Sequence, residues 1–276
     1  MPISYDDLGA SANGLFNDHH NAGSLNFSQK GQVGSGGATY ELNASNAVSG
    51  GPIEWNCEVT ADWLKINHDH AGNISKSLDF AVKQVPGLNV NWSPAFNKDS
   101  GMNLGNLKVN YANKKANVNV DMALSKPDNA DFDVTVAPCN NCPETILGLK
   151  GNLSASGLNN ASYAFQTAKD GMTASFEGTD LKNPMQGKGS FYKALNNNKN
   201  FCCYGIEATT SGSLAVAAAT GCCKSGYRYK LDNTGRFSVT RLSPINRAVN
   251  LALSAEMNMT SLSAGGHKFG ASFSFE

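Results

Sequence analysis

The sequence predicts an all-β fold, a single closed barrel of many antiparallel strands preceded by one short helix. Apolar and polar residues alternate over most of the 276 positions, which is the period of strands with two differently solvated faces. Clusters of Gly, Asn and Asp separate the alternating segments, as in a series of hairpins. Beyond the first turns of the chain there is room for about 18 to 20 strands of roughly 10 residues. That number is too large for one ordinary sandwich.

The N-terminal segment differs from the rest because its apolar residues fall at helical spacing. These residues are Tyr5, Leu8, Ala12, Leu15 and Phe16. Ser4 followed by Asp7 matches the pattern of a capping box at a helix start. We therefore expect an amphipathic helix over residues 2–16, within an N-terminal helix and linker at 1–20 that precedes a barrel at 21–276. The pattern alone also allows this helix to pack on the outside of the barrel.

The strand pattern continues to the last residue. It is clearest over residues 78–83, 88–93, 117–124, 147–153, 227–231 and 268–276. Turn-forming clusters are expected at 34–37, 97–101, 159–160, 196–200 and 232–235. Because no linker or shift in composition interrupts the series, the strands are assigned to one domain.

The composition of the chain excludes several classes of protein. Charged residues make up only 16% of the chain, against roughly 25% in an ordinary soluble domain. The formal net charge is zero, which gives no electrostatic reason to expect nucleic acid as a partner. No apolar run approaches the roughly 18 residues of a transmembrane helix, and no secretory signal is visible. Composition alone still allows a soluble all-β protein.

Both ends of the chain resemble the mitochondrial outer-membrane porins of the voltage-dependent anion channel family. The run from Tyr5 to Ala12, followed by Phe16, is similar to the pore helix of that family, and Ala264-Gly265-Gly266-His267-Lys268-Phe269-Gly270 is similar to its last strand. The resemblance implies a transmembrane barrel of 19 strands with the helix inside the lumen. It also implies voltage-gated diffusion of small hydrophilic metabolites and ions, with nucleotides among the candidates, and neither a cofactor nor an enzymatic activity.

The resemblance also assigns roles to particular residues. The pore helix would carry Tyr5, Leu8, Ala12 and Phe16, with Leu8 and its apolar neighbours against the barrel wall. A C-terminal insertion signal, read by the outer-membrane assembly machinery, would consist of Gly266, Phe269, Phe273 and Phe275. The same aromatic residues also fit a girdle in contact with membrane lipids.

The charge pattern departs from the family. The positions of the family's basic residues on and after the pore helix hold Ala10, Asn13 and Asp18. Because lumenal cations attract anions, their absence predicts weak or absent anion selectivity. Arg228 and Lys230 are the remaining candidates for lumenal charge, although they also fit an ordinary solvated polar face.

The cysteines and histidines do not predict a metal site. Seven cysteines are an odd number, so at least one thiol should be free. Cys139-x-x-Cys142 could be a redox pair or half of a zinc site, with the doublets 202–203 and 222–223 as the other half. The two doublets could also form a cross-strand disulfide if they lie opposite each other. Neighbours on a strand point to opposite faces, so each doublet would offer one thiol, and small buried or lipid-facing thiols are the simpler reading. His19, His20, His68 and His70 lie in polar stretches and are read as solvated.

Two alternatives keep the same fold. The first is the protein-import pore of the same membrane, a related barrel that typically carries N-terminal extensions. The second is a barrel that has lost conductance and serves as a structural part of a larger mitochondrial complex. Assembly as a homo-oligomer is compatible with each of these hypotheses.

Overall fold

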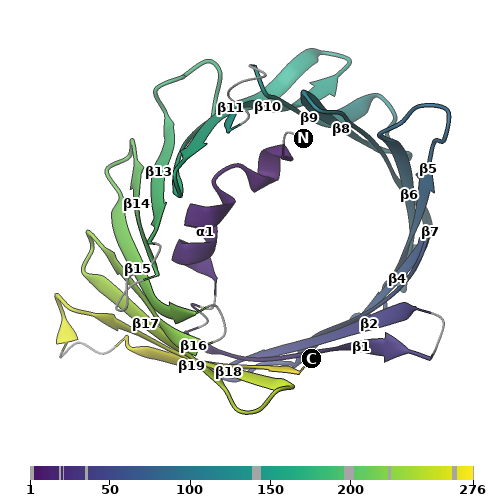
Figure 1. Ribbon diagram of the computed structural model, residues 1–276. Coiled ribbons are helices and arrows are strands. Elements are labelled where there is room, and N and C mark those ends of the chain that lie inside the picture. The colour runs from purple at the N-terminus through teal and green to yellow at the C-terminus, as the bar shows by residue number, and fades with distance from the viewer. Residues whose placement is uncertain are drawn as a thin grey trace.

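The protein is described by a computed structural model that covers residues 3–18, 20, 22–34, 37–138, 144–195, 202–222, 225–262 and 266–275. Its strands form a single 19-stranded sheet that closes into a barrel, and a short helical segment lies inside the ring (Figure 1). Figure 1 shows this segment against one side of the barrel, with open space between it and the opposite wall. The all-β barrel predicted from the sequence is therefore confirmed.

The elements follow one another in a simple meander. The helical segment consists of η1 (Tyr5–Asp7) and α1 (Ala10–Asn17). The strands are β1 (Ser24–Val33), β2 (Ala38–Ala47), β3 (Glu54–Ala61), β4 (Leu64–Asp69), β5 (Ile74–Ala81), β6 (Leu88–Asn97), β7 (Gly101–Ala112), β8 (Ala116–Ala123), β9 (Asn129–Val136), β10 (Thr145–Ser154), β11 (Gly157–Lys169), β12 (Met172–Gly178), β13 (Gly187–Ala194), β14 (Cys203–Thr209), β15 (Leu214–Cys222), β16 (Ser225–Asp232), β17 (Arg236–Pro244), β18 (Val249–Asn258) and β19 (Lys268–Phe275).

The barrel closes through a parallel pairing of its first and last strands. Each strand pairs antiparallel with its neighbours in the sequence, whereas β1 and β19 run side by side in the same direction, from Leu25 opposite Ala271 to Gln29 opposite Phe275. An odd number of alternating strands requires this parallel closure. All odd-numbered strands consequently end at the same edge of the barrel, which we call the C-terminal rim because β19 ends there.

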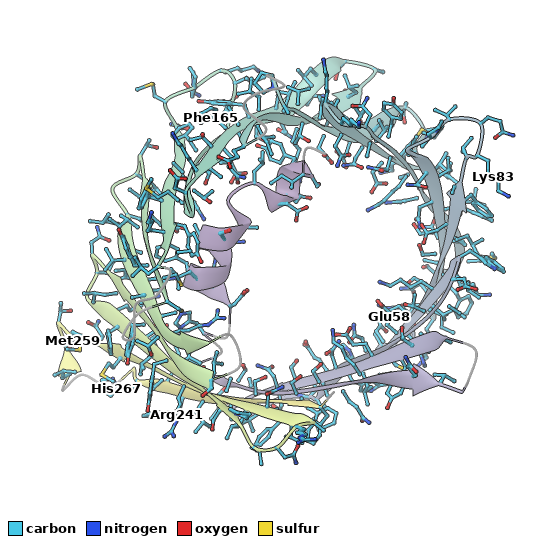
Figure 2. The ribbon with its side chains drawn as sticks, in the orientation of Figure 1. Glu58, Lys83, Phe165, Arg241, Met259 and His267 are labelled. Atoms are coloured by element: carbon cyan, nitrogen blue, oxygen red, sulfur yellow. The ribbon has the colours of Figure 1, made fainter. Side chains whose placement is uncertain are left out.

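The two faces of the sheet have different chemistry. Glu58 points into the barrel, whereas Phe165 points away from it (Figure 2). Large apolar side chains remain exposed on the outside, such as Ile206 at 44% and Leu253 at 48%. Because backbone groups in hydrocarbon must all be paired, a closed sheet with an apolar exterior suits a bilayer. Among the described residues, no helix has the length and apolar character needed to cross a membrane.

The expected N-terminal helix is confirmed, but its expected continuity over residues 2–16 is wrong. A 3-10 turn at η1 and the helix α1 are separated at Leu8 and Gly9, and the Ser4 side chain makes no capping hydrogen bond. Gly9 has a φ of +74°, and a Cβ there would lie 2.8 Å from the Ser175 Oγ. The backbone thus turns through a left-handed glycine at a close contact with the wall, which an uninterrupted helix could not do.

The turn expected at Asn159 and Asn160 is also wrong, because both residues lie inside β11. The chain reverses earlier, between the end of β10 at Ser154 and the start of β11 at Gly157. Asn160 has a φ of +48°, and the pairing of these strands shifts between Lys150 and Asn152. The tolerance of asparagine for left-handed backbone therefore serves an irregularity within a strand. The cluster at 196–200 lies outside the described residues.

Candidate functional site

The helix α1 packs against β13, β14 and β15 on the lumenal side. Ala12, Leu15 and Phe16 are almost completely buried, with 1%, 4% and 0% of their surface exposed. They form one apolar cluster with Cys203, Ala217 and Ala219 of the wall. Burial of each large side chain stabilises docking by about 1.5 to 3 kcal/mol before the cost of ordering the segment.

The wall beneath the helical segment is built from small residues. A Cβ on Gly205 would lie 3.2 Å from the side chains of Leu15 and Phe16, and a Cβ on Gly148 would lie 2.7 Å from the Tyr5 ring. The lumenal positions of β14 and β15 that lie under the helix are Cys203, Gly205, Ala215, Ala217 and Ala219. Sequence reasoning missed this docking surface. The detectable signal was a run of small residues at positions that are polar on most other strands.

Two basic side chains from β16 contact the C-terminal end of α1. The Arg228 Nη1 donates to the carbonyl of Gly14 at 3.2 Å, and the Lys230 Nζ donates to the carbonyl of Phe16 at 3.3 Å. The last carbonyls of a helix have no partner within it, and its dipole favours cations at this end. The two predicted lumenal charges therefore face the lumen, where they are committed to the helix.

The N-terminal part of the segment is held by Lys150 of β10. Its Nζ lies 2.7 Å from the Asp6 Oδ1 and 5.8 Å from the centre of the Tyr5 ring. The Tyr5 hydroxyl donates to the Ser162 Oγ at 3.1 Å. Burial raises the pKa of Tyr5 above its usual value, although the hydrogen bond to Ser162 opposes this change. Tyr5 is therefore a neutral donor at physiological pH.

Backbone groups of the segment are also bound by the wall. The Gly9 N–H donates to the Gln166 Oε1 at 2.6 Å, and the Thr135 Oγ1 donates to the carbonyl of Ile3 at 2.6 Å. These contacts satisfy groups that the interrupted helix leaves without internal partners. The segment is thus held along its length by side chains from β9, β10, β11 and β16.

The four residues expected on the pore helix do not behave alike. Tyr5, Ala12 and Phe16 are buried against the wall, whereas Leu8 is only half-buried and belongs to the break between η1 and α1. The polar residues Asn13 and Asn17 are exposed to the lumen. The apolar face of the helical segment is therefore centred on Phe16 and not on Leu8.

The residues of the expected insertion signal lie on and before β19. Gly266 precedes the strand with a φ of +83°. Phe269, Phe273 and Phe275 share one face of β19, and Phe269 is 67% exposed. The ring centre of Phe275 lies 5.2 Å from that of Phe27 on β1, so this aromatic face continues across the seam of the barrel.

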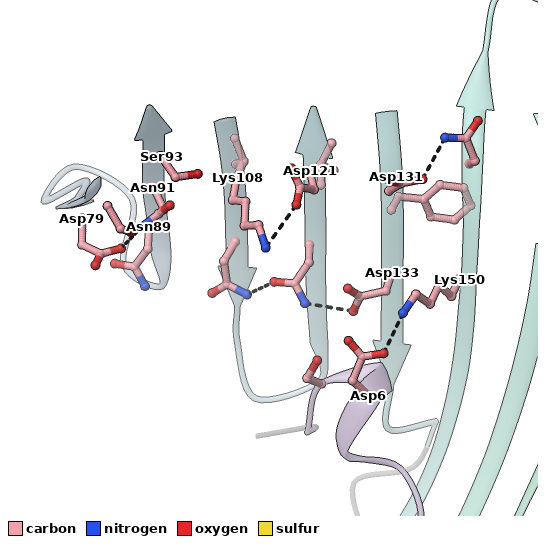
Figure 3. Close-up of a pocket in the computed structure, with 18 of the residues that line it drawn as sticks. Asp6, Asp79, Asn89, Asn91, Ser93, Lys108, Asp121, Asp131, Asp133 and Lys150 are labelled. Atoms are coloured by element: carbon pink, nitrogen blue, oxygen red, sulfur yellow. Dashed lines mark hydrogen bonds and ion pairs between the residues drawn. The ribbon is translucent and has the colours of Figure 1, made fainter. Parts of the chain in front are cut away.

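A polar cavity of about 1540 Å³ lies along the wall that α1 leaves free, and Ser4, Asp6 and Lys150 also line it. We call β3–β9 the open wall and β13–β16 the covered wall. Figure 3 shows the charged and amide side chains of the open wall aimed into this cavity. The Asp79, Asp131 and Asp133 carboxylates accept hydrogen bonds from asparagine amides at 2.6, 2.8 and 2.9 Å. Their negative charge is therefore hydrogen-bonded but not neutralised by these partners.

The lumenal positions of the described strands carry more acidic than basic residues. The acidic residues are Glu41, Glu54, Glu58, Asp69, Asp79, Asp121, Asp131, Asp133, Glu177, Glu207, Asp232 and Glu256. The basic residues are Lys30, Lys65, Lys108, Lys150, Lys188, Arg228, Lys230, Arg236 and Lys268. Asp6, Asp7 and Asp18 add to the acidic side, which gives fifteen acidic against nine basic residues in the described lumen.

Most lumenal lysines have an acidic partner on a neighbouring strand. The pairs are Lys30–Glu41 at 2.9 Å, Lys65–Glu58 at 2.7 Å, Lys108–Asp121 at 3.1 Å, Lys188–Glu207 at 2.8 Å and Lys268–Glu256 at 3.6 Å. Such pairs cancel one another beyond a few ångströms. The electrostatic potential of the lumen is therefore dominated by the acidic residues outside these pairs.

Cys57, Cys202 and Cys203 are free thiols. Cys57 lies on the outer face of β3, and Cys203 lies under α1. The expectation that a doublet would offer only one thiol fails for Cys202 and Cys203, whose sulfur atoms are 3.8 Å apart. The reason is that β14 begins at Cys203, so Cys202 does not follow the alternation of a strand.

No group of three or more His, Cys, Asp or Glu side chains within the described residues is arranged to hold a metal ion. His20, His68 and His70 are described, whereas His19 lies outside the described part of the chain. Cys139, Cys142 and Cys223 also lie outside the described part of the chain, so the predictions made for these positions remain predictions.

Comparison with known proteins finds a matching family model and several similar relatives. The family model described as eukaryotic porin matches residues 1–270. The protein named non-selective voltage-gated ion channel VDAC2 from Meleagris gallopavo is 23% identical over 300 residues, which cover 100% of this chain and 95% of the relative. The proteins of the same name from Homo sapiens and Mesocricetus auratus are 22% and 24% identical, with the same coverage.

Proposed function

This chain belongs to the eukaryotic porin family, as a divergent member of the voltage-dependent anion channels, and we propose that its lumen gives anions little or no advantage over cations. Membership of this family gives the general function of the protein. The protein is a voltage-gated, non-enzymatic pore of the mitochondrial outer membrane that passes ions and small metabolites. The proposal concerns which of these solutes the pore favours.

The observation that carries the proposal is the acidic excess of the lumen. On the open wall the lumenal positions of the described strands hold seven acidic and two basic residues. Lumenal charge of one sign changes the local ion concentration through a potential of several kT. A negative lumen therefore raises the concentration of cations at the wall and opposes the entry of nucleotide anions.

The positions of the basic residues support the same proposal. Arg228 and Lys230 donate to the carbonyls of α1, and Lys150 pairs with Asp6. These cations lie close to partial or full negative charges, so they add little positive potential to the water in the pore. We therefore assign them to positioning of the pore helix and not to selection of anions.

Reversal potentials in planar bilayers test the proposal. In a gradient of potassium chloride at low salt, where screening is weakest, we expect a reversal potential near zero or on the cation side. A strong chloride preference would contradict the proposal. A purified barrel without any conductance would favour the structural alternative, and stable copurification with import receptors would favour the import pore.

A double variant locates the effect on the open wall. Asp131→Asn with Asp133→Asn removes two charges whose hydrogen-bond partners are amides. We expect the permeability ratio of potassium to chloride to fall, because the potential at that wall becomes less negative. Asp99→Asn, in the exposed turn between β6 and β7, is the control and should leave the ratio unchanged.

The insertion signal is proposed on the outer face of β19. Phe269, Phe273 and Phe275 present a continuous apolar edge beside the closing seam. Phe273→Ser should slow insertion by the outer-membrane assembly machinery while the purified protein still refolds in detergent. Equal loss of refolding in detergent would instead assign these residues to the lipid-facing girdle.

A further inference from the structure

The outer wall of the barrel carries cations but no acidic residue among the described strand positions. Every Asp and Glu of those strands lies on the lumenal face, whereas Lys76, Lys169, Lys193 and Arg241 lie at outward positions. Three of these four cations are near the ends of the odd-numbered strands β11, β13 and β17. They therefore gather at the C-terminal rim, on one side of the barrel.

Arg241 lies at one end of this group, because β17 is six strands from β11 in the sheet, or about 29 Å at roughly 4.8 Å per strand. It points outward from β17 (Figure 2). It stands opposite Tyr227 of β16 in the sheet, and its guanidinium carbon lies 5.8 Å from the centre of the Tyr227 ring. A cation over an aromatic face is held in a fixed position. The guanidinium is thus presented on the outer surface, next to an aromatic residue of the type found at membrane interfaces.

The depth of Arg241 places its charge at the headgroup level. The residue lies three positions before Pro244, the last residue of β17. At about 3.4 Å per residue and a strand tilt of about 40°, its Cα is roughly 8 Å below the rim. Because a charge in hydrocarbon is costly, the long side chain must reach toward the interface.

The neighbouring cations lie closer to the rim. Lys169 is the last residue of β11, and Lys193 is the second-to-last residue of β13. The Lys193 Nζ donates to the carbonyl of Asp170 in the turn between β11 and β12 at 3.0 Å. Arg247 follows in the turn after β17. Two described acidic residues lie near this group, Asp170 and Glu144, and the carbonyl of Glu144 accepts from the Ala168 N–H beside Lys169 at 3.0 Å. The described rim between β11 and β18 is therefore net positive.

We propose that this surface binds the headgroups of anionic phospholipids, one at Lys169 and Lys193 and one at Arg241 with Tyr227. The proposal needs the barrel to lie in a bilayer but is independent of the selectivity of its lumen. Guanidinium and ammonium groups at the interface pair with phosphate, and the planar fork of arginine can contact two oxygens of one phosphate. The apolar residues below it on the outer wall, such as Val239 of the same strand, suit the acyl chains of the lipid.

Lipid retention measures the proposed contact directly. The channel is reconstituted in nanodiscs of phosphatidylcholine with a minor fraction of phosphatidylinositol, and native mass spectrometry compares the two lipids that it retains. Each basic residue at a membrane surface contributes about fivefold in affinity for anionic lipid. Arg241→Gln should lower the affinity of the site at Tyr227 about fivefold, and the triple variant with Lys169→Gln and Lys193→Gln should lower the total retention of phosphatidylinositol by about 5- to 25-fold.

Two further variants make the result decisive. Lys76→Gln removes an isolated outward cation of β5, at the other edge of the barrel, and should leave retention unchanged. Arg241→Lys keeps the charge and should retain most of the phosphatidylinositol. None of these residues faces the lumen, so unchanged single-channel conductance verifies that each variant is folded. The proposal is overturned by unchanged retention in the triple variant, by an equal loss in Lys76→Gln, or by failure of Arg241→Lys to restore retention.

Discussion

The covered wall and the open wall follow the same alternation of residues but use their lumenal positions differently. The covered wall places Gly205, Ala217 and Ala219 under the helix, whereas the open wall places residues such as Asp79 and Asp133 in water. The lumenal charge follows this division, with three basic and two acidic residues on the covered wall and seven acidic and two basic on the open wall. The small residues of the covered wall bind a segment of the chain, and the charged residues of the open wall face the water of the lumen.

The helix therefore covers an apolar surface whose exposure to water would be energetically unfavourable. The apolar cluster of α1 with β14 and β15 removes Leu15 and Phe16 from water almost completely. Apolar burial of this kind is only weakly screened by salt, unlike the charges of the open wall. We expect docking of the helix to depend on packing and selectivity to depend on charge, so the two properties should respond to different substitutions.

The largest effect is expected from deletion of residues 1–20. The open lumen becomes wider, so single-channel conductance should rise and the response to voltage should weaken, as planar-bilayer recordings can measure. The exposed patch around Ala217 and Ala219 should also make the truncated barrel less stable to heat. Unchanged conductance and unchanged voltage response would show that the helix does not restrict the pore.

Overfilling the docking surface should have the next largest effect. In Gly205→Val the new Cβ lies 3.0 Å from the Phe191 carbonyl oxygen of the wall and 3.2 Å from the side chains of Leu15 and Phe16. The further methyl groups must displace the helix. Overpacking costs about 1 to 3 kcal/mol, which corresponds to roughly 5- to 150-fold in the docking equilibrium. Hydrogen exchange of the α1 amides should accelerate by a similar factor.

Gly189→Val is the matched control. Gly189 lies on the outer face of β13, where a Cβ would approach no atom closer than 3.9 Å. Exchange of the α1 amides should stay at its original rate in this variant. Equal acceleration in both variants would mean that valine disturbs the sheet itself and not the docking of the helix.

Much of the fold was predictable because it depends on a pattern that repeats nineteen times. Alternation sets the two faces of every strand, and the parallel closure follows from an odd number of strands. The predictions that were wrong concern local features of the backbone. The break at Gly9 depends on contact with Ser175, and the early turn before Gly157 depends on where β10 ends, so neither could be derived from a short stretch of sequence.

The site was only partly predictable, for a related reason. Arg228 and Lys230 were recognised as lumenal candidates because alternation assigns faces. Their partners, the carbonyls of Gly14 and Phe16, are more than two hundred residues away in the chain, and periodicity carries no information about such contacts. The docking surface escaped notice because small residues on one face of a strand carry no distinctive chemistry.

Removal of both cations from the end of α1 should have an intermediate effect. In Arg228→Gln with Lys230→Gln, the carbonyls of Gly14 and Phe16 lose charged donors. Each cation near a helix C-terminus contributes about 0.3 to 1 kcal/mol, so closure should occur at a lower voltage and the α1 amides should exchange a few times faster. Arg236→Gln, at the start of β17, is the control and should change neither measurement. A shift of the same size in the control would assign the effect to the general lumenal potential.

The smallest effect is expected at Lys150, because its contact with Asp6 is exposed. The two side chains retain 45% and 70% of their surface exposure, so the pair contributes at most about 1 kcal/mol and is screened by salt. Lys150→Met should therefore loosen η1 only at low ionic strength, as hydrogen exchange of the Asp7 and Leu8 amides can show. Lys108→Met, which breaks a pair with Asp121 on the open wall, should not change that exchange. If the loosening persists at high salt, Lys150 holds the segment through its stem and the Tyr5 ring, and the packing that anchors α1 extends to the first residues of the chain.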